Sequence, residues 1–171
     1  MQTTAAVQDA FKVRSPHGLR ALSQKARNFA GITVRHLQHF NLPGRSWNDL
    51  SSPCNTLVIN LQDYGGRSEA RLHLDKPLPL DRQRPNALSF VPAGMTTWGY
   101  SDNIASVREL RLSFDGALLQ RHLDVKLSTL QDPRLMFQDF RMLQIARLFA
   151  NELDSTEEDN PLFGEGMPLL S

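Results

Sequence analysis

Two segments of alternating polarity carry the side chains best suited to hold a ligand. Glu109 and Arg111 lie two residues apart in one segment, and Asn60 and Gln62 lie two residues apart in the other. Because successive side chains of a strand point to opposite faces, residues two apart share a face. Convergent polar groups among apolar walls are typical of a ligand pocket. We therefore predict a pocket lined by Asn60, Gln62, Tyr64, Trp98, Glu109 and Arg111.

Arginine in this pattern suits a ligand that carries a carboxylate. A guanidinium forms bidentate pairs with carboxylates, and Glu109 on the same face would hold Arg111 in place. Trp98, Tyr100 and Trp47 are candidates for stacking on such a ligand. Two alternatives stay open, namely a solvated outer sheet face and an Arg–Glu surface pair worth under about 1 kcal/mol.

No motif for catalysis or metal binding is found in the sequence. The five histidines include no His-x-His pair, and His36 and His39 are three apart, which places them on opposite faces of a strand. There is no Gly-x-Ser-x-Gly motif and no phosphate-binding glycine loop. Cys54, the single cysteine, opens an apolar run and is predicted to be a buried, inert thiol. We therefore predict no catalytic residue, no metal and no cofactor.

Composition bounds the class of protein. The chain has 171 residues, a net charge of +1, 40% apolar and 22% charged residues, so we expect one globular domain rather than a basic nucleic-acid scaffold. One cysteine excludes an internal disulfide. No apolar run approaches the length of a membrane span, and no secretory signal opens the chain. We expect a cytoplasmic protein without membrane contact.

Short apolar runs punctuated by turns dominate the middle of the chain. Their spacing of roughly ten residues leaves no room for crossover helices, which favours an antiparallel sandwich or barrel. Residues 1–27 are predicted to form a loosely attached arm, 28–116 the barrel, and 117–171 a helical part with the start of a linker. The predicted strands are 29–40, 54–62, 70–74, 88–91, 96–100 and 107–114.

A helix is predicted from Pro133 to Leu153, with Asp132 as its N-cap and Pro133 at the first helical position. Two adjacent apolar stripes follow at helical spacing. One stripe would pack on the sheet and the other would meet a second copy of the chain, unless both pack within one chain. The predicted homodimer interface consists of Met136, Phe140 and Leu143.

The order of these features resembles one protein family. Five segments are similar to the effector-binding domain of AraC-type bacterial transcription regulators. In chain order they are residues 88–99 (LSFVPAGMTTWG), 107–114 (VRELRLSF), 132–135 (DPRL), 145–153 (IARLFANEL) and 160–165 (NPLFGE). The resemblance covers roughly residues 29–166. It implies a cupin-like jelly-roll barrel that binds a small-molecule effector, and helices that form a homodimer.

The resemblance also implies that a helix-turn-helix part binds DNA. No such basic helical part occurs before Ser171, so DNA binding is expected only from a C-terminal domain outside this chain. The Gly166-Met-Pro168 run departs from the second family-like helix. Two other functions stay open, a small cupin enzyme of the isomerase or oxygenase kind and a stand-alone interaction module.

Overall fold

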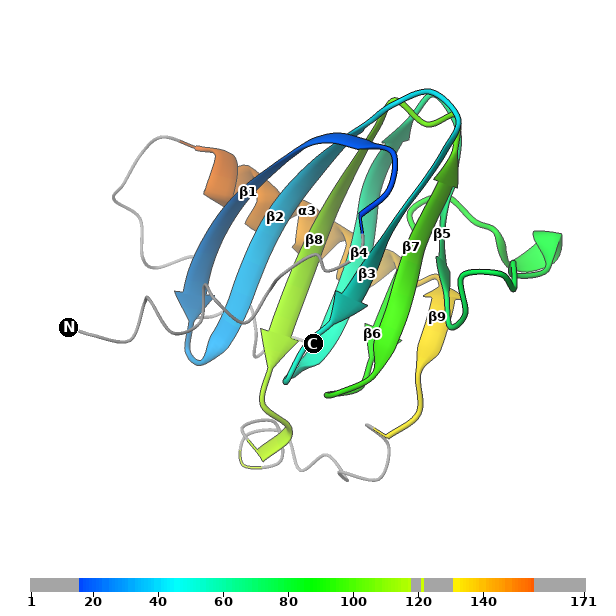
Figure 1. Ribbon diagram of the computed structural model, residues 1–171. Helices are drawn as coiled ribbons and strands as arrows, with labels where there is room; N and C mark the ends of the chain where they lie inside the picture. The colour runs from blue at the N-terminus through cyan, green and yellow to red at the C-terminus, as the bar shows by residue number, and fades with distance from the viewer. Residues whose placement is uncertain (1–15, 118–120, 122–130, 156–171) are drawn as a thin grey trace.

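Two antiparallel sheets face each other, and one helix covers the outer side of the larger sheet (Figure 1). The computed structural model describes residues 16–117, 121 and 131–155. The larger sheet has the order β1 (Leu19–Phe29), β2 (Ile32–Asn41), β8 (Ser106–Phe114), β4 (Asn55–Tyr64), β6 (Leu88–Val91), β9 (Arg134–Phe137). The smaller sheet has the order β3 (Arg45–Ser51), β7 (Thr96–Asp102), β5 (Ser68–Arg71). A 3-10 turn, η1 (Leu80–Arg82), precedes β6, and helix α3 (Phe140–Asp154) follows β9. The predicted, mainly antiparallel β fold is therefore confirmed.

The apolar core lies between the larger sheet and α3 rather than between the two sheets. Ile59 and Leu110 pair across β4 and β8 and contribute to a buried cluster with Phe149 of the helix. Leu143 and Leu153 extend this cluster along α3. Because strand side chains alternate, the opposite face of the same strands points toward the smaller sheet and is free to carry polar groups.

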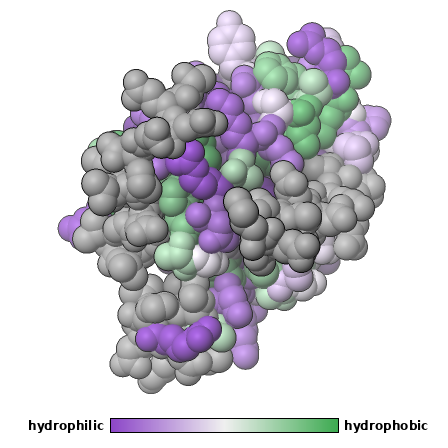
Figure 2. Space-filling model, turned by 90° about the vertical axis from the view of Figure 1, so that its left-hand side faces the viewer, coloured by the Kyte–Doolittle hydropathy of each residue, from purple (hydrophilic) through white to green (hydrophobic). Residues whose placement is uncertain are grey.

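The last third of the predicted arm is a strand. Residues 19–27 belong to β1, which pairs with β2 from Leu19↔Asn41 to Phe29↔Ile32, so the prediction of a loose attachment is wrong for them. The side chains from Arg20 to Asn28 are exposed, so β1 has no apolar alternation to reveal it. Figure 2 views the molecule from the β1 side and shows hydrophilic residues through the described part of that face.

The predicted helix start at Pro133 is also wrong. Arg134–Phe137 forms β9, which pairs with β6, and α3 begins only at Phe140. The N-cap is Asp139 instead of Asp132, because the Asp139 carboxylate accepts a hydrogen bond from the Met142 backbone N–H. The described C-terminal part thus holds one strand and one helix instead of a helical dimerisation subdomain.

This change separates the three residues of the predicted dimer interface. Met136 lies in β9 with 8% of its surface exposed, and Leu143 packs in the core at 7% exposure. Phe140 is 73% exposed at the start of α3. A stripe of these three residues on one helix therefore does not exist. Three parts of the sequence prediction lie outside the described residues. They are residues 1–15, the helical turns predicted after Ala117 (Arg121 apart), and the family-like segment 160–165.

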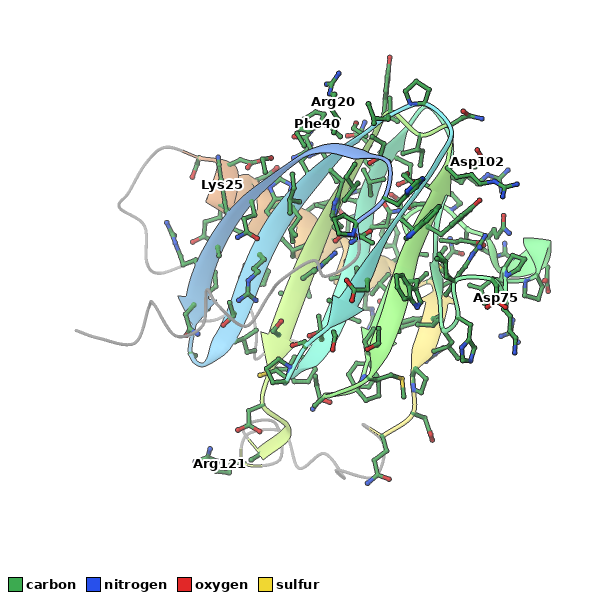
Figure 3. The ribbon with its side chains drawn as sticks, viewed as in Figure 1. Arg20, Lys25, Phe40, Asp75, Asp102 and Arg121 are labelled. Atoms are coloured by element: carbon green, nitrogen blue, oxygen red, sulfur yellow. The ribbon has the colours of Figure 1, made fainter. Side chains whose placement is uncertain are left out.

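Opposite charges hold the C-terminal end of α3 on the sheet. Asp154 accepts from Arg108 Nη2 at 3.1 Å, its Oδ1 lies 3.0 Å from His36 Nδ1, and Lys25 Nζ is 3.4 Å away. Figure 3 shows Lys25 of β1 beside the end of the helix. Burial would raise the pKa of Asp154, but His36 and Lys25 lower it. The helix is thus fixed to β1, β2 and β8 at its last turn.

Candidate ligand site between the sheets

A cavity of about 80 Å³ lies between the two sheets, enough for several water molecules or a small metabolite. The smaller sheet contributes mostly short side chains to its wall, including Ser46, Ala70 and Ser101. A Cβ at Gly99 of β7 would lie 2.8 Å from Asn48 Oδ1, so a larger residue there would displace the Asn48 side chain. Short residues on this sheet thus leave room opposite the longer polar residues of the larger sheet.

A buried charged cluster forms the opposite wall. Arg111 donates through Nε and Nη2 to Oε1 of Glu109, and His39 Nε2 lies 3.2 Å from the same oxygen. The exposed fractions are 3% for Arg111 and 4% for His39. Burial alone would raise the pKa of Glu109, but Arg111 and His39 lower it to about 2. Glu109 is therefore ionised at neutral pH.

A second arginine lies behind this cluster. Arg35 of β2 pairs with Arg111 of β8 in the sheet register and is 4% exposed. Burial and the nearby Arg111 lower the pKa of Arg35. Arg35 does not line the cavity. The charged side chains that line the cavity are therefore Glu109 and Arg111 with the contacting His39, and Glu69 of β5, which pairs with Arg71.

Asn60 presents a fixed hydrogen-bond acceptor to the cavity. Its Nδ2 donates to Asp63 Oδ1 and to Ser68 Oγ, both at 2.8 Å. Its Oδ1 is buried without a hydrogen-bond donor in the described part of the chain. Asn41 Oδ1 and His39 Nδ1 are also buried without partners among the described residues. Buried polar atoms without partners cost free energy unless water or a ligand satisfies them.

Of the predicted pocket residues, Asn60, Glu109 and Arg111 lie together on the cavity wall, Trp98 also borders the cavity, and Gln62 and Tyr64 do not line it. Asn60, Glu109 and Arg111 face the cavity together, and Asn60 pairs directly with Glu109. Gln62 and Tyr64 are exposed, the latter at 68%. The register shifts between Asn60 and Gln62, so Gln62 pairs with Arg108, which faces α3. This β-bulge turns the end of β4 away from the cavity.

The aromatic candidates border the cavity, but the register directs their rings elsewhere. Trp98 pairs with Asp49 and therefore lies on the face of the smaller sheet opposite to Gly99. Trp47 and Tyr100 pair with each other on that same face. The Trp47 ring stacks on His17 with centroids 3.8 Å apart, and the Arg71 guanidinium lies 3.5 Å from the Tyr100 centroid. Stacking of these rings on a ligand in the cavity is not supported.

Sequence reasoning missed His39 and Asn41 as cavity residues. Both lie on the face of β2 that also carries Arg35 and the buried Leu37, so this face shows no consistent polar pattern in the sequence. Ala30 and Gly31 have φ of 48° and 86° and form the turn that ends β1. The predicted separation of His36 and His39 is confirmed: His36 contacts Asp154 of α3, and His39 lines the cavity.

Among the described residues, no group of three or more His, Cys, Asp and Glu side chains lies close enough to hold a metal ion. Cys54 is a free thiol, half-buried rather than fully buried as predicted. None of the helices in the described ranges has the length and apolar character needed to cross a membrane.

These features define a class: a two-sheet antiparallel β protein with an apolar core under its helix and, between its sheets, a cavity that carries charged and polar groups among apolar walls. No protein-family model matches the sequence, and no curated protein matches it either.

Several solved structures are similar to the chain at low identity. The AraC-like transcriptional activator CuxR is 15% identical over 86% of this chain and 50% of that chain, with a TM-score of 0.45. A cupin-like protein from Thermotoga maritima is 11% identical over 73% and 82% of the two chains, with a TM-score of 0.39. Recombinant oxalate oxidase in complex with glycolate is 12% identical over 85% and 77%, with a TM-score of 0.39. At these TM-scores the likenesses place the chain in no family and do not distinguish a regulator from an enzyme.

Proposed function

We propose that this chain is a sensor domain that binds a small molecule in the cavity between its sheets. The observation that carries the proposal is the group of polar side chains among the apolar walls of that cavity: the ionised Glu109, and the Asn60 and Asn41 amide oxygens, which have no hydrogen-bond donor among the described residues. The apolar cluster under α3 lies on the other side of the larger sheet, away from this cavity. A ligand would supply the hydrogen bonds that these buried groups lack.

Strand β8 offers a physical route from the cavity to the helix. Glu109 and Arg111 face the cavity, while Arg108 and Leu110 on the same strand face α3. A ligand that prefers one position of β8 therefore changes the position of Asp154, which Arg108 contacts. The size of such a shift is limited by the difference in ligand affinity between the two arrangements.

We also propose that the sensor belongs to an AraC-type transcription regulator that acts as a homodimer. The support is the resemblance of residues 88–99 and 107–114 to the effector-binding domain of that family. DNA binding would then come from a helix-turn-helix part outside this chain.

An enzyme is the second candidate, because His39 and Glu109 form a close pair in a cavity. The charge state of Glu109 favours sensing. A general base works best when its pKa is near the working pH, whereas the pKa of Glu109 is about 2. This carboxylate is therefore a weak proton acceptor at neutral pH.

A ligand screen by thermal shift, followed by calorimetric titration, tests the proposed function. A specific ligand at 100 times its Kd stabilises the fold by about 2.7 kcal/mol. We expect the ligand to be recovered unchanged and to slow amide exchange at the end of α3. Turnover of the bound molecule, or the absence of any ligand that raises Tm, contradicts the sensor proposal.

A further inference from the structure

Asn60 contributes a fixed acceptor to the cavity wall. The side-chain amide of Asn60 cannot flip without losing hydrogen bonds, because Nδ2 donates to the Asp63 carboxylate and to the Ser68 hydroxyl. A reversed amide would place an oxygen against Asp63 Oδ1, which accepts but cannot donate. The Asn60 Oδ1 atom therefore remains directed away from these partners as an acceptor.

The His39–Glu109 contact leaves one ring nitrogen for a ligand. The Glu109 carboxylate accepts from His39 Nε2. The other ring nitrogen, Nδ1, is buried without a partner in the described part of the chain. A ligand hydroxyl, which can both donate and accept, can pair with this atom beside the carboxylate.

The charge of Glu109 opposes a ligand that brings its own carboxylate. Two N–H groups of Arg111 already point to Oε1 of Glu109, so this guanidinium holds an internal carboxylate. A second carboxylate in a cavity of about 80 Å³ would lie close to the first and repel it. The expectation from the sequence, that Arg111 binds a ligand carboxylate, is therefore not supported by this geometry.

From these contacts we propose that the cavity selects a small uncharged molecule with several O–H or N–H donors and discriminates against its carboxylate counterpart. The inference rests on the proposed function and names the chemistry of the ligand. The cavity volume favours molecules of a few carbon atoms, such as small polyols and hydroxyamides.

Matched pairs of probes test this selectivity on the full chain. Calorimetric titrations at pH 7 compare glycerol with glycerate, erythritol with erythronate, and lactamide with lactate. We expect at least one uncharged member to bind with a Kd at least tenfold lower than that of its carboxylate partner. A preference for the carboxylate overturns this inference and leaves the proposed function standing. If neither member of any pair binds, this inference is overturned, and the wider thermal-shift screen decides the proposed function.

Two variants locate the selectivity. Asn60→Leu removes the fixed acceptor and is expected to raise the Kd of the uncharged probe about tenfold. Gln62→Leu is the matched control, because the β-bulge places Gln62 outside the cavity, and its Kd should stay within twofold of the wild type. Equal effects of the two substitutions contradict the assignment. Should Asn60→Leu fail to fold, Asn60→Ser provides the same comparison with less change in volume.

Discussion

The buried carboxylate of Glu109 is the group whose removal tests the description of the cavity most directly. In Glu109→Gln the charge is lost, while Arg111, at 3% exposure, stays buried. Breaking a buried ion pair by neutralising one partner typically costs 3–5 kcal/mol, because the other charge remains uncompensated. We expect the free energy of unfolding at pH 7 to fall by about that amount.

The same carboxylate predicts a pH dependence with a definite sign. Its pKa falls from an ordinary 4.5 to about 2 in the folded chain, which corresponds to on the order of 3 kcal/mol. Because the folded pKa is depressed, this contribution is present above pH 4.5 and is lost as the pH falls toward 2. The deficit of Glu109→Gln should therefore shrink between pH 5 and pH 2.

Urea denaturation at pH 7 and at pH 3 measures both effects, with Glu152→Gln as the control. Glu152 contacts Arg27 at 3.3 Å, but Arg27 is 42% exposed, so this pair is expected to contribute no more than about 1 kcal/mol. A Glu109→Gln deficit below 1 kcal/mol at pH 7, or a deficit equal at the two pH values, refutes the buried ion pair.

Further substitutions test the helix and its contacts. Phe149→Ala should lower the free energy of unfolding by about 3–5 kcal/mol in urea denaturation, since Phe149 is buried under the sheet. Asp139→Ala should cost about 1 kcal/mol in the same assay, because it removes the N-cap of α3; no change would contradict the cap. Phe140→Asp should leave the fold intact, because Phe140 is exposed, and should lower the mass measured by light scattering if Phe140 contacts a second copy of the chain. Leu143→Asp should unfold the chain, because Leu143 is buried in the core. A monomeric wild type rules out the dimer contact at Phe140. Asp154→Asn should accelerate amide exchange in the last turn of α3, and unchanged exchange there would show that the ion pairs do not hold the helix.

Local sequence patterns were sufficient to predict the position of several strands. The strand predicted over 88–91 coincides with β6, and that over 107–114 differs from β8 by one residue. Both have apolar runs bounded by turns, and these signals act within a few residues of the chain. The shared face of Glu109 and Arg111 follows from the same alternation, so the center of the cavity cluster was predictable.

Other elements depend on partners far away in the chain. The Arg45–Ser51 segment reads as polar, and it forms β3 because β7 pairs with it. The bulge in β4 arises where that strand pairs with β8, and it decides that Asn60 faces the cavity while Gln62 does not. Neither event leaves a distinct local signal, because register is a property of two strands rather than one.

Composition and alternation alone determined that this chain is mainly antiparallel β, with Asn60, Glu109 and Arg111 on strand faces that could be read in advance. Only the tertiary structure decided that Glu109 joins His39, that Trp98 turns its ring to the other face, and that the apolar core lies under α3. The physical reason is that alternation assigns side chains to one of two faces, whereas the packing of sheets and helix decides what each face meets.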